Sequence, residues 1–155
     1  MKKMLIIITC TLFLTACAYK KESKEYAIYK NYINELNEIK GSSVNNPLVI
    51  NINIEKISEN LFAYTSLINK NKEKMNNVLA LLIHNKETEN AFPSVGIFDE
   101  KVTISNEEKG IKLTGYVENI EDIRFKLLIK YTNDEGKIVK YYYVEENPTI
   151  SAPDN

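Results

Sequence analysis

The chain has 155 residues, of which 44% are hydrophobic and 26% are charged, and its formal net charge is −1. This length suits one domain rather than two, and the composition excludes disorder along the whole chain. A weakly acidic chain whose only arginine is Arg124 also lacks the positive surface that a phosphate backbone attracts, so we expect no nucleic-acid partner.

Residues 1–17 have the composition of a secretion signal. Lys2 and Lys3 precede an apolar run over residues 5–14, which is well short of the roughly 20 residues that a membrane-spanning helix needs. The run leads into Leu14-Thr15-Ala16-Cys17. This sequence resembles the lipobox of bacterial lipoproteins, which consists of an aliphatic residue, two small residues and a cysteine. The alternative is an ordinary secretory signal that is followed by an incidental cysteine.

The resemblance implies a lipid anchor on Cys17. Residues 1–16 are then removed as a signal peptide, the Cys17 sulfur receives diacylglycerol, and the new amine can be acylated with a chain such as palmitate. Because each buried CH₂ contributes about 0.8 kcal/mol, two or three chains hold far more firmly than one. We therefore expect an outward-facing protein anchored by its lipid in the cell membrane of a low-GC Gram-positive bacterium. Since Cys10 leaves with the signal peptide, no cysteine remains for a disulfide or a metal site.

The next segment is predicted to form a tether and one helix. Residues 17–25 are polar and rich in lysine, which is typical of a tether. Over residues 26–40 the apolar positions recur at a spacing of three and four, which predicts a helix that ends before Gly41. This helix can pack on its own domain, which is the commoner use, or it can bind another protein. The apolar positions are Tyr26, Tyr29, Ile33, Leu36 and Ile39.

After Pro47 the apolar residues alternate with polar ones, which predicts half-buried strands. The region 59–85 fits helical spacing as well, and a helical reading there gives an α+β fold. We prefer strands, because short strands surround this region. The prediction is a mainly β, immunoglobulin-like antiparallel sandwich over residues 48–145, preceded by one helix and followed by a flexible tail over residues 146–155. The seven expected strands cover residues 48–54, 61–69, 77–85, 101–105, 111–118, 123–131 and 137–144.

The sequence has no recognisable catalytic set. His84 is the only histidine, and no acid or nucleophile at a compatible spacing accompanies it, so we interpret it as a satisfied or solvent-facing residue at a strand end. We expect no metal and no cofactor. A cell-wall hydrolase needs two carboxylates across a sugar-binding cleft. The candidates for such carboxylates are the pairs Glu87 and Glu89, Asp99 and Glu100, and Glu121 and Asp122.

The ten tyrosines are the remaining feature. In a strand, consecutive residues face opposite sides, so the three adjacent tyrosines cannot all enter one core. A tyrosine outside the core offers a large contact area and a hydroxyl group for recognition, although covering a sheet face is its commoner role. The residues of this candidate recognition surface are Tyr116, Tyr131, Tyr141, Tyr142 and Tyr143.

Together these features predict a non-enzymatic, lipid-anchored module of the bacterial envelope that binds a protein or cell-wall partner. An accessory subunit of an envelope complex and an immunity factor are both compatible with this prediction. The alternatives are a small envelope hydrolase and a structural spacer.

Overall fold

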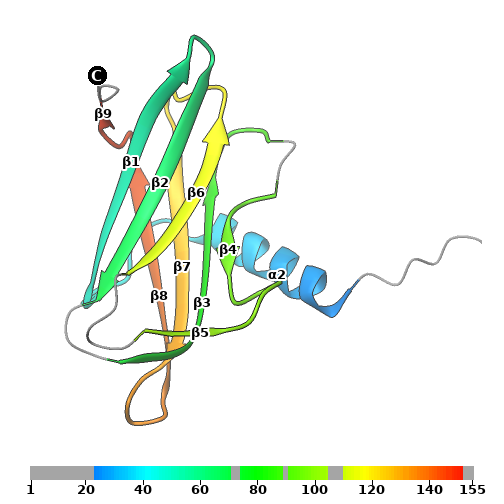
Figure 1. The fold of residues 1–155 in the computed structure, drawn as a ribbon, viewed down its shortest axis with the longest axis vertical. Helices are drawn as coiled ribbons and strands as arrows, with labels where there is room; N and C mark the ends of the chain where they lie inside the picture. Colours follow the sequence, from blue (N-terminus) through cyan, green and yellow to red (C-terminus); the bar gives the residue numbers. More distant parts are fainter. Residues whose placement is uncertain (1–22, 71–73, 89–90, 105–109, 152–155) are drawn as a thin grey trace, which may run out of the picture.

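A computed structural model describes residues 23–70, 74–88, 91–104 and 110–151 (Figure 1). The predicted mainly β fold is confirmed: two sheets pack face to face, and one helix precedes the strands. The predicted signal peptide, Cys17, the predicted tether up to residue 22 and residues 152–155 lie outside the described residues. The elements are α2 (Lys24–Glu38), β1 (Leu48–Ser58), β2 (Leu61–Lys70), β3 (Met75–His84), β4 (Ser94–Val95), β5 (Val102–Ile104), β6 (Ile111–Val117), β7 (Arg124–Thr132), β8 (Ile138–Glu146) and β9 (Ile150–Ser151).

Six of the seven predicted strands are ordered as in an immunoglobulin-like sandwich. The first sheet has the order β6-β2-β1-β9, and the second has the order β4-β3-β7-β8 with β5 also paired to β3. The first, second and fifth of the seven predicted strands therefore share one sheet, and the third, sixth and seventh share the other. The fourth strand, β5, pairs with β3 instead of β6. The helical alternative for residues 59–85 is wrong, because β2 and β3 occupy this region.

Two short strands were not predicted. β4 pairs with β3, and β9 pairs in parallel with β1 through Ile54 and Ile150. The segment that was expected to be a flexible tail therefore begins with backbone pairing to the first sheet. Two residues of strand carry too little periodicity to be recognised in a sequence.

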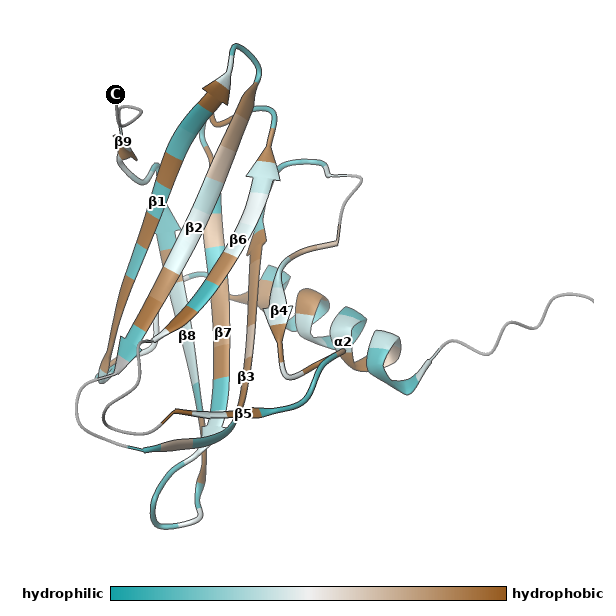
Figure 2. Ribbon diagram, in the orientation of Figure 1, coloured by the Kyte–Doolittle hydropathy of each residue, from teal (hydrophilic) through white to brown (hydrophobic). Residues whose placement is uncertain are grey.

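The main core lies between the two sheets. β1 shows how the sequence builds it: Ile52 and Ile54 point into the sandwich, whereas Asn51 and Asn53 point to solvent. Figure 2 shows the same alternation of colour along β1. Phe125 and Leu127 of β7 are fully buried from the opposite side. Each such side chain contributes roughly 1.5–3 kcal/mol relative to an exposed one.

The helix covers the outer face of the second sheet, so this sheet is buried on both sides. α2 lies across the strands in Figure 1, and Tyr29 and Leu36 pack on Leu81 of β3 and Leu128 of β7. β3 is consequently buried from Val78 to His84 without interruption. This two-sided burial explains why its sequence lacked a clear period of two. The predicted helix over residues 26–40 is confirmed with slightly earlier ends, and it packs on its own domain.

The loop after the helix protects the edge of β8. The backbone N–H groups of Tyr142 and Val144 donate hydrogen bonds of 2.9 Å to the hydroxyl oxygens of Ser43 and Ser42, respectively. The Ser43 N–H also donates to the Tyr142 carbonyl at 2.8 Å. An exposed strand edge invites pairing with other chains, and these bonds occupy part of it.

Candidate binding surfaces

The five candidate tyrosines do not form one surface, so the prediction of a shared recognition surface is wrong. Tyr131 is only 2% exposed and lies in the main core, where its ring is 6.4 Å from that of Tyr141. Tyr141 and Tyr143 also pack against this core, while Tyr142 faces the helix on the other side of β8. Tyr116, on β6, is 55% exposed. The main core therefore takes up Tyr131, Tyr141 and Tyr143, and the helix covers Tyr142.

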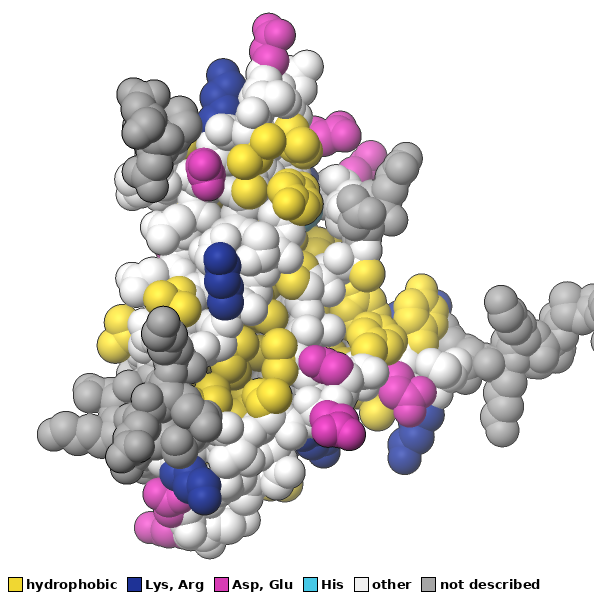
Figure 3. Space-filling view, in the orientation of Figure 1, with side chains coloured by type: hydrophobic (Ala, Val, Ile, Leu, Met, Phe, Trp, Pro, Cys, Tyr) yellow, Lys and Arg dark blue, Asp and Glu magenta, His cyan; other side chains and the backbone are white. Residues whose placement is uncertain are grey.

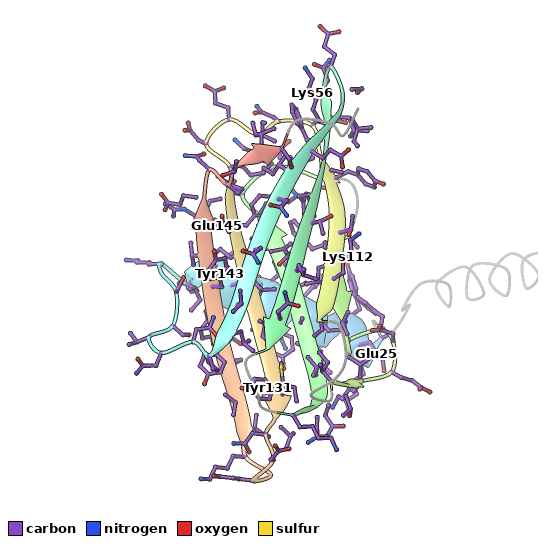
Figure 4. All side chains as sticks on the ribbon, turned by 60° about the vertical axis from the view of Figure 1, so that its left-hand side comes forward. Glu25, Lys56, Lys112, Tyr131, Tyr143 and Glu145 are labelled. Carbon is purple, nitrogen blue, oxygen red and sulfur yellow. The ribbon has the colours of Figure 1, made fainter. Side chains whose placement is uncertain are left out.

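Tyr142 instead helps to fasten the helix to β8. Its hydroxyl and the Lys140 ammonium both donate hydrogen bonds to the Glu35 carboxylate of α2. Partial burial raises the pKa of Glu35, but these two hydrogen bonds outweigh burial and leave the pKa below its usual range. On the other side of β8, Tyr143 donates to Glu145 at 2.9 Å, and burial together with this carboxylate raises the pKa of Tyr143 to about 12. Figure 4 shows Tyr143 and Glu145 along β8. These tyrosines are therefore occupied by contacts within the domain.

The outer face of the first sheet is the broad surface that no described element covers. Here β1, β2 and β6 present outward-facing side chains, and we call the uncharged ones the open face. Its central row joins Asn53, Thr65 and Thr114 across the three strands, with the two threonine hydroxyl oxygens 3.4 Å apart. Charged residues face the same side in the two neighbouring rows: Glu55 is paired with Ala63, and Lys112, which Figure 4 labels on β6, is paired with Leu67. The open face consists of Val49, Asn51, Asn53, Ala63, Thr65, Leu67, Thr114 and Tyr116.

Figure 3 looks onto the open face, where uncharged polar side chains and backbone cover much of the surface and a Lys or Arg side chain stands among them. From a strand spacing of about 4.8 Å and a rise of about 3.3 Å per residue, the open face measures roughly 15 Å by 20 Å. Asn and Thr supply donors and acceptors, and Tyr116 with Leu67 supplies exposed apolar area. Low charge with an exposed tyrosine is the composition that protein interfaces favour at their centre.

A second exposed apolar region lies at the start of α2. Tyr26 is 43% exposed and Phe98 is 54% exposed, and the ring of Tyr29 lies between them at 6.2 Å and 5.2 Å, respectively. We call these three residues the aromatic patch. The Tyr29 hydroxyl accepts a 2.6 Å hydrogen bond from the Phe92 N–H, which ties the chain before β4 to the helix. Figure 3 shows hydrophobic side chains gathered over this region.

A groove of about 600 Å³ runs beside the aromatic patch, between α2, β3 and the segment that follows β4. Lys24, Lys101 and Lys130 line it together with Glu25 and Asp99, so positive and negative groups nearly balance. The Asp99 carboxylate is already used locally, since it accepts a 2.8 Å hydrogen bond from the Gly96 N–H.

His84 is neither solvent-facing nor fully satisfied, which corrects the expectation from the sequence. It is 5% exposed at the end of β3, and its ring packs edge-on against those of Tyr64, Phe92 and Phe125 at 5.1–5.8 Å. Nδ1 accepts a hydrogen bond from the Lys86 N–H at 3.3 Å, while Nε2 is buried without a partner among the described residues. Burial lowers the pKa of His84, so the ring is neutral at pH 7.

The acidic pairs take different positions. Glu89 lies outside the described residues, and Asp99 and Glu100 are exposed beside the groove. Asp122 lines a smaller hollow of about 340 Å³ together with Glu146, whose carboxylate forms an ion pair with Arg124. Of these two carboxylates, that of Glu146 is engaged by the ion pair.

Within the described part of the chain, no three His, Cys, Asp or Glu residues gather as a metal site. No helix among the described residues is long and apolar enough to cross a bilayer. Comparison with protein-family models, with curated proteins and with solved structures finds no match to this chain.

Proposed function

We propose that this protein is a lipid-anchored, outward-facing module of the bacterial envelope, attached through Cys17, and that it binds a protein partner without catalysis. The observation that carries the binding role is the open face. The lipobox-like sequence at residues 14–17 supports the anchor.

The composition of the open face supports a protein as the partner. Sites for small molecules and sugars are concave, whereas this surface follows one sheet and is broad. Charged residues are depleted at the centre of protein interfaces, because their desolvation is costly, and tyrosine is enriched there. The central Asn53-Thr65-Thr114 row offers hydrogen bonds at little desolvation cost. The roughly 15 Å by 20 Å area suits the core of a standard interface, which buries about 800 Å² on each partner.

The opposite face of the sandwich is less suited to this role. There α2 covers the second sheet, and the Glu35 contact with Lys140 and Tyr142 fastens the helix in place. A partner on that side must either displace the helix or bind its charged outer side.

Two measurements test the proposal. The first is incorporation of labelled palmitate into the wild-type protein and into Cys17→Ser during growth of a bacterium that processes lipoproteins. We expect label on the wild type alone, and loss of membrane retention in Cys17→Ser. An unlabelled wild type, or a serine variant that stays on the membrane, refutes the anchor.

The second measurement is crosslinking and partner recovery with variants of the open face. Thr114→Lys places a charge in its central row, and Tyr116→Ala removes its exposed ring. We expect partner recovery to fall about thirtyfold, which corresponds to a central residue worth about 2 kcal/mol. Ile138→Lys, on the exposed part of β8 beside the groove, is the matched control and should leave recovery unchanged. Full recovery with Thr114→Lys, loss with Ile138→Lys, or recovery of wall fragments instead of a protein overturns the assignment.

Substitution of the acidic residues separates binding from hydrolysis. Asp122→Asn and Glu146→Gln change the hollow at the start of β7 and leave the open face intact. We expect both to retain partner recovery and the cellular phenotype. Loss of a wall-cleaving activity in either variant would favour a hydrolase instead.

A further inference from the structure

The aromatic patch lies at the end of the helix that begins next to the proposed anchor. Figure 1 shows the N-terminal turns of α2 projecting past β4, away from the first sheet. We propose that Tyr26 and Phe98 rest on the lipid surface that holds Cys17, so that the domain has a fixed orientation on the membrane. This inference rests on the proposed function, because it requires the lipid anchor.

The length of the tether restricts where the domain can be. Only residues 18–22 separate Cys17 from Ser23, whose side chain accepts a hydrogen bond from the Tyr26 N–H at the start of α2. A fully extended chain spans at most about 3.6 Å per residue, so Ser23 stays within roughly 20 Å of the lipidated residue. Tyr26 follows within one helical turn. The aromatic patch is therefore kept near the membrane surface whatever path the tether takes.

The chemistry of the patch suits the boundary between lipid and water. Tyrosine places an apolar ring beside a hydroxyl, and aromatic residues concentrate at this boundary in membrane proteins. Phe98 adds a ring that is 54% exposed and has no polar group of its own. The Lys30 ammonium lies 4.7 Å from the centre of the Tyr26 ring, and a lysine in such a position can extend its charge to the headgroups.

Local charge indicates that the contact is apolar rather than electrostatic. Four lysines and three acidic residues lie beside the patch or in the adjoining groove, so there is little net charge with which to attract anionic lipid. We therefore expect contact with zwitterionic membranes and little dependence on salt. The seven residues are Lys24, Lys30, Lys101, Lys130, Glu25, Asp99 and Glu100.

The patch is also held in shape before any contact. The Tyr29 hydroxyl is joined to the backbone of Phe92, and the Tyr29 ring packs between Tyr26 and Phe98. Binding therefore requires little ordering of side chains. Since the open face belongs to the other sheet, contact through the patch leaves the open face available to a partner.

The absence of tryptophan from the chain makes a direct test available. Phe98→Trp places a single fluorescent probe in the patch, and Tyr116→Trp places one on the open face as the matched control. The full-length, lipidated proteins are reconstituted into phosphatidylcholine vesicles with and without brominated acyl chains, which quench nearby tryptophan. We expect at least about twofold quenching and a blue shift for Phe98→Trp, at low and high salt, and no change for Tyr116→Trp.

The outcomes distinguish this inference from the proposed function. An unquenched Phe98→Trp in a vesicle-bound protein overturns the membrane contact and leaves the anchor intact. Protein that fails to stay with the vesicles refutes the anchor itself. A blue shift that depends on protein concentration but not on bromine identifies a second copy as the occupant and also overturns the inference. Tyr26→Trp is the second probe, and it must give the same result if Phe98→Trp disturbs folding.

Discussion

Replacing Gly115 with alanine should create a steric clash between β6 and the buried ring of Tyr64 on β2. Gly115 of β6 is paired with Tyr64 of β2, and a Cβ atom there would lie 2.2 Å from the Tyr64 hydroxyl oxygen and 2.4 Å from Cζ. Tyr64 is buried, and its ring contacts His84 at 5.2 Å and Phe125 at 5.0 Å. The ring cannot move away without losing these contacts. A cross-strand aromatic ring over a glycine is a known way to stabilise such a pair.

The expected cost of Gly115→Ala is about 1–3 kcal/mol, which is the range for overpacking a core. Urea unfolding of the purified protein measures it. Gly41→Ala is the matched control, because nothing lies within 4 Å of a Cβ at that position, and it should change stability by less than about 0.5 kcal/mol. Tyr64→Leu removes the clashing ring, so Gly115→Ala should cost only a few tenths of a kcal/mol in that background. Equal effects of Gly115→Ala and Gly41→Ala, or strictly additive effects in the double variant, would refute this reasoning.

Two further substitutions test the titratable groups through the pH dependence of stability. Burial lowers the pKa of His84, so wild-type stability should decline as the pH falls below the ordinary value of about 6.5. His84→Leu should remove this decline, and at pH 8 its free energy of unfolding should be within about 1 kcal/mol of the wild-type value. Urea unfolding at several pH values measures both effects. An unchanged decline in the variant contradicts the assignment. Glu35 has a lowered pKa, so its contribution is present above about pH 4.3 and is lost as the pH falls through the folded value. Glu35→Gln should therefore cost up to about 1 kcal/mol at pH 7 and almost nothing near pH 2, and a difference that persists in acid excludes the ion pair as its cause.

The sequence alone was sufficient for the helix and for the strands with a clear alternation, whereas residues 59–85 fitted helical spacing as well as strands. Alternation of Ile and Asn in β1 predicts a half-buried strand because side chains in a strand have a period of two. The spacing of Tyr29, Ile33 and Leu36 predicts the helix for the corresponding reason. These are local properties, because each depends only on the spacing of apolar residues within one segment. The lipobox-like residues 14–17 are likewise a local signal, and the anchor that they imply stays a prediction.

Which faces remain open was decided only by tertiary structure. Tyr142 looked available from the sequence, but α2 covers it, and contacts between residues 107 positions apart have no local signature. The same helix buries β3 on both sides, which removed the period that would have identified it as a strand. The open face and the aromatic patch each combine residues from separate segments, as Phe98 and Tyr26 do. Their existence depends on which strands and helices become neighbours, and packing of the whole chain determines that.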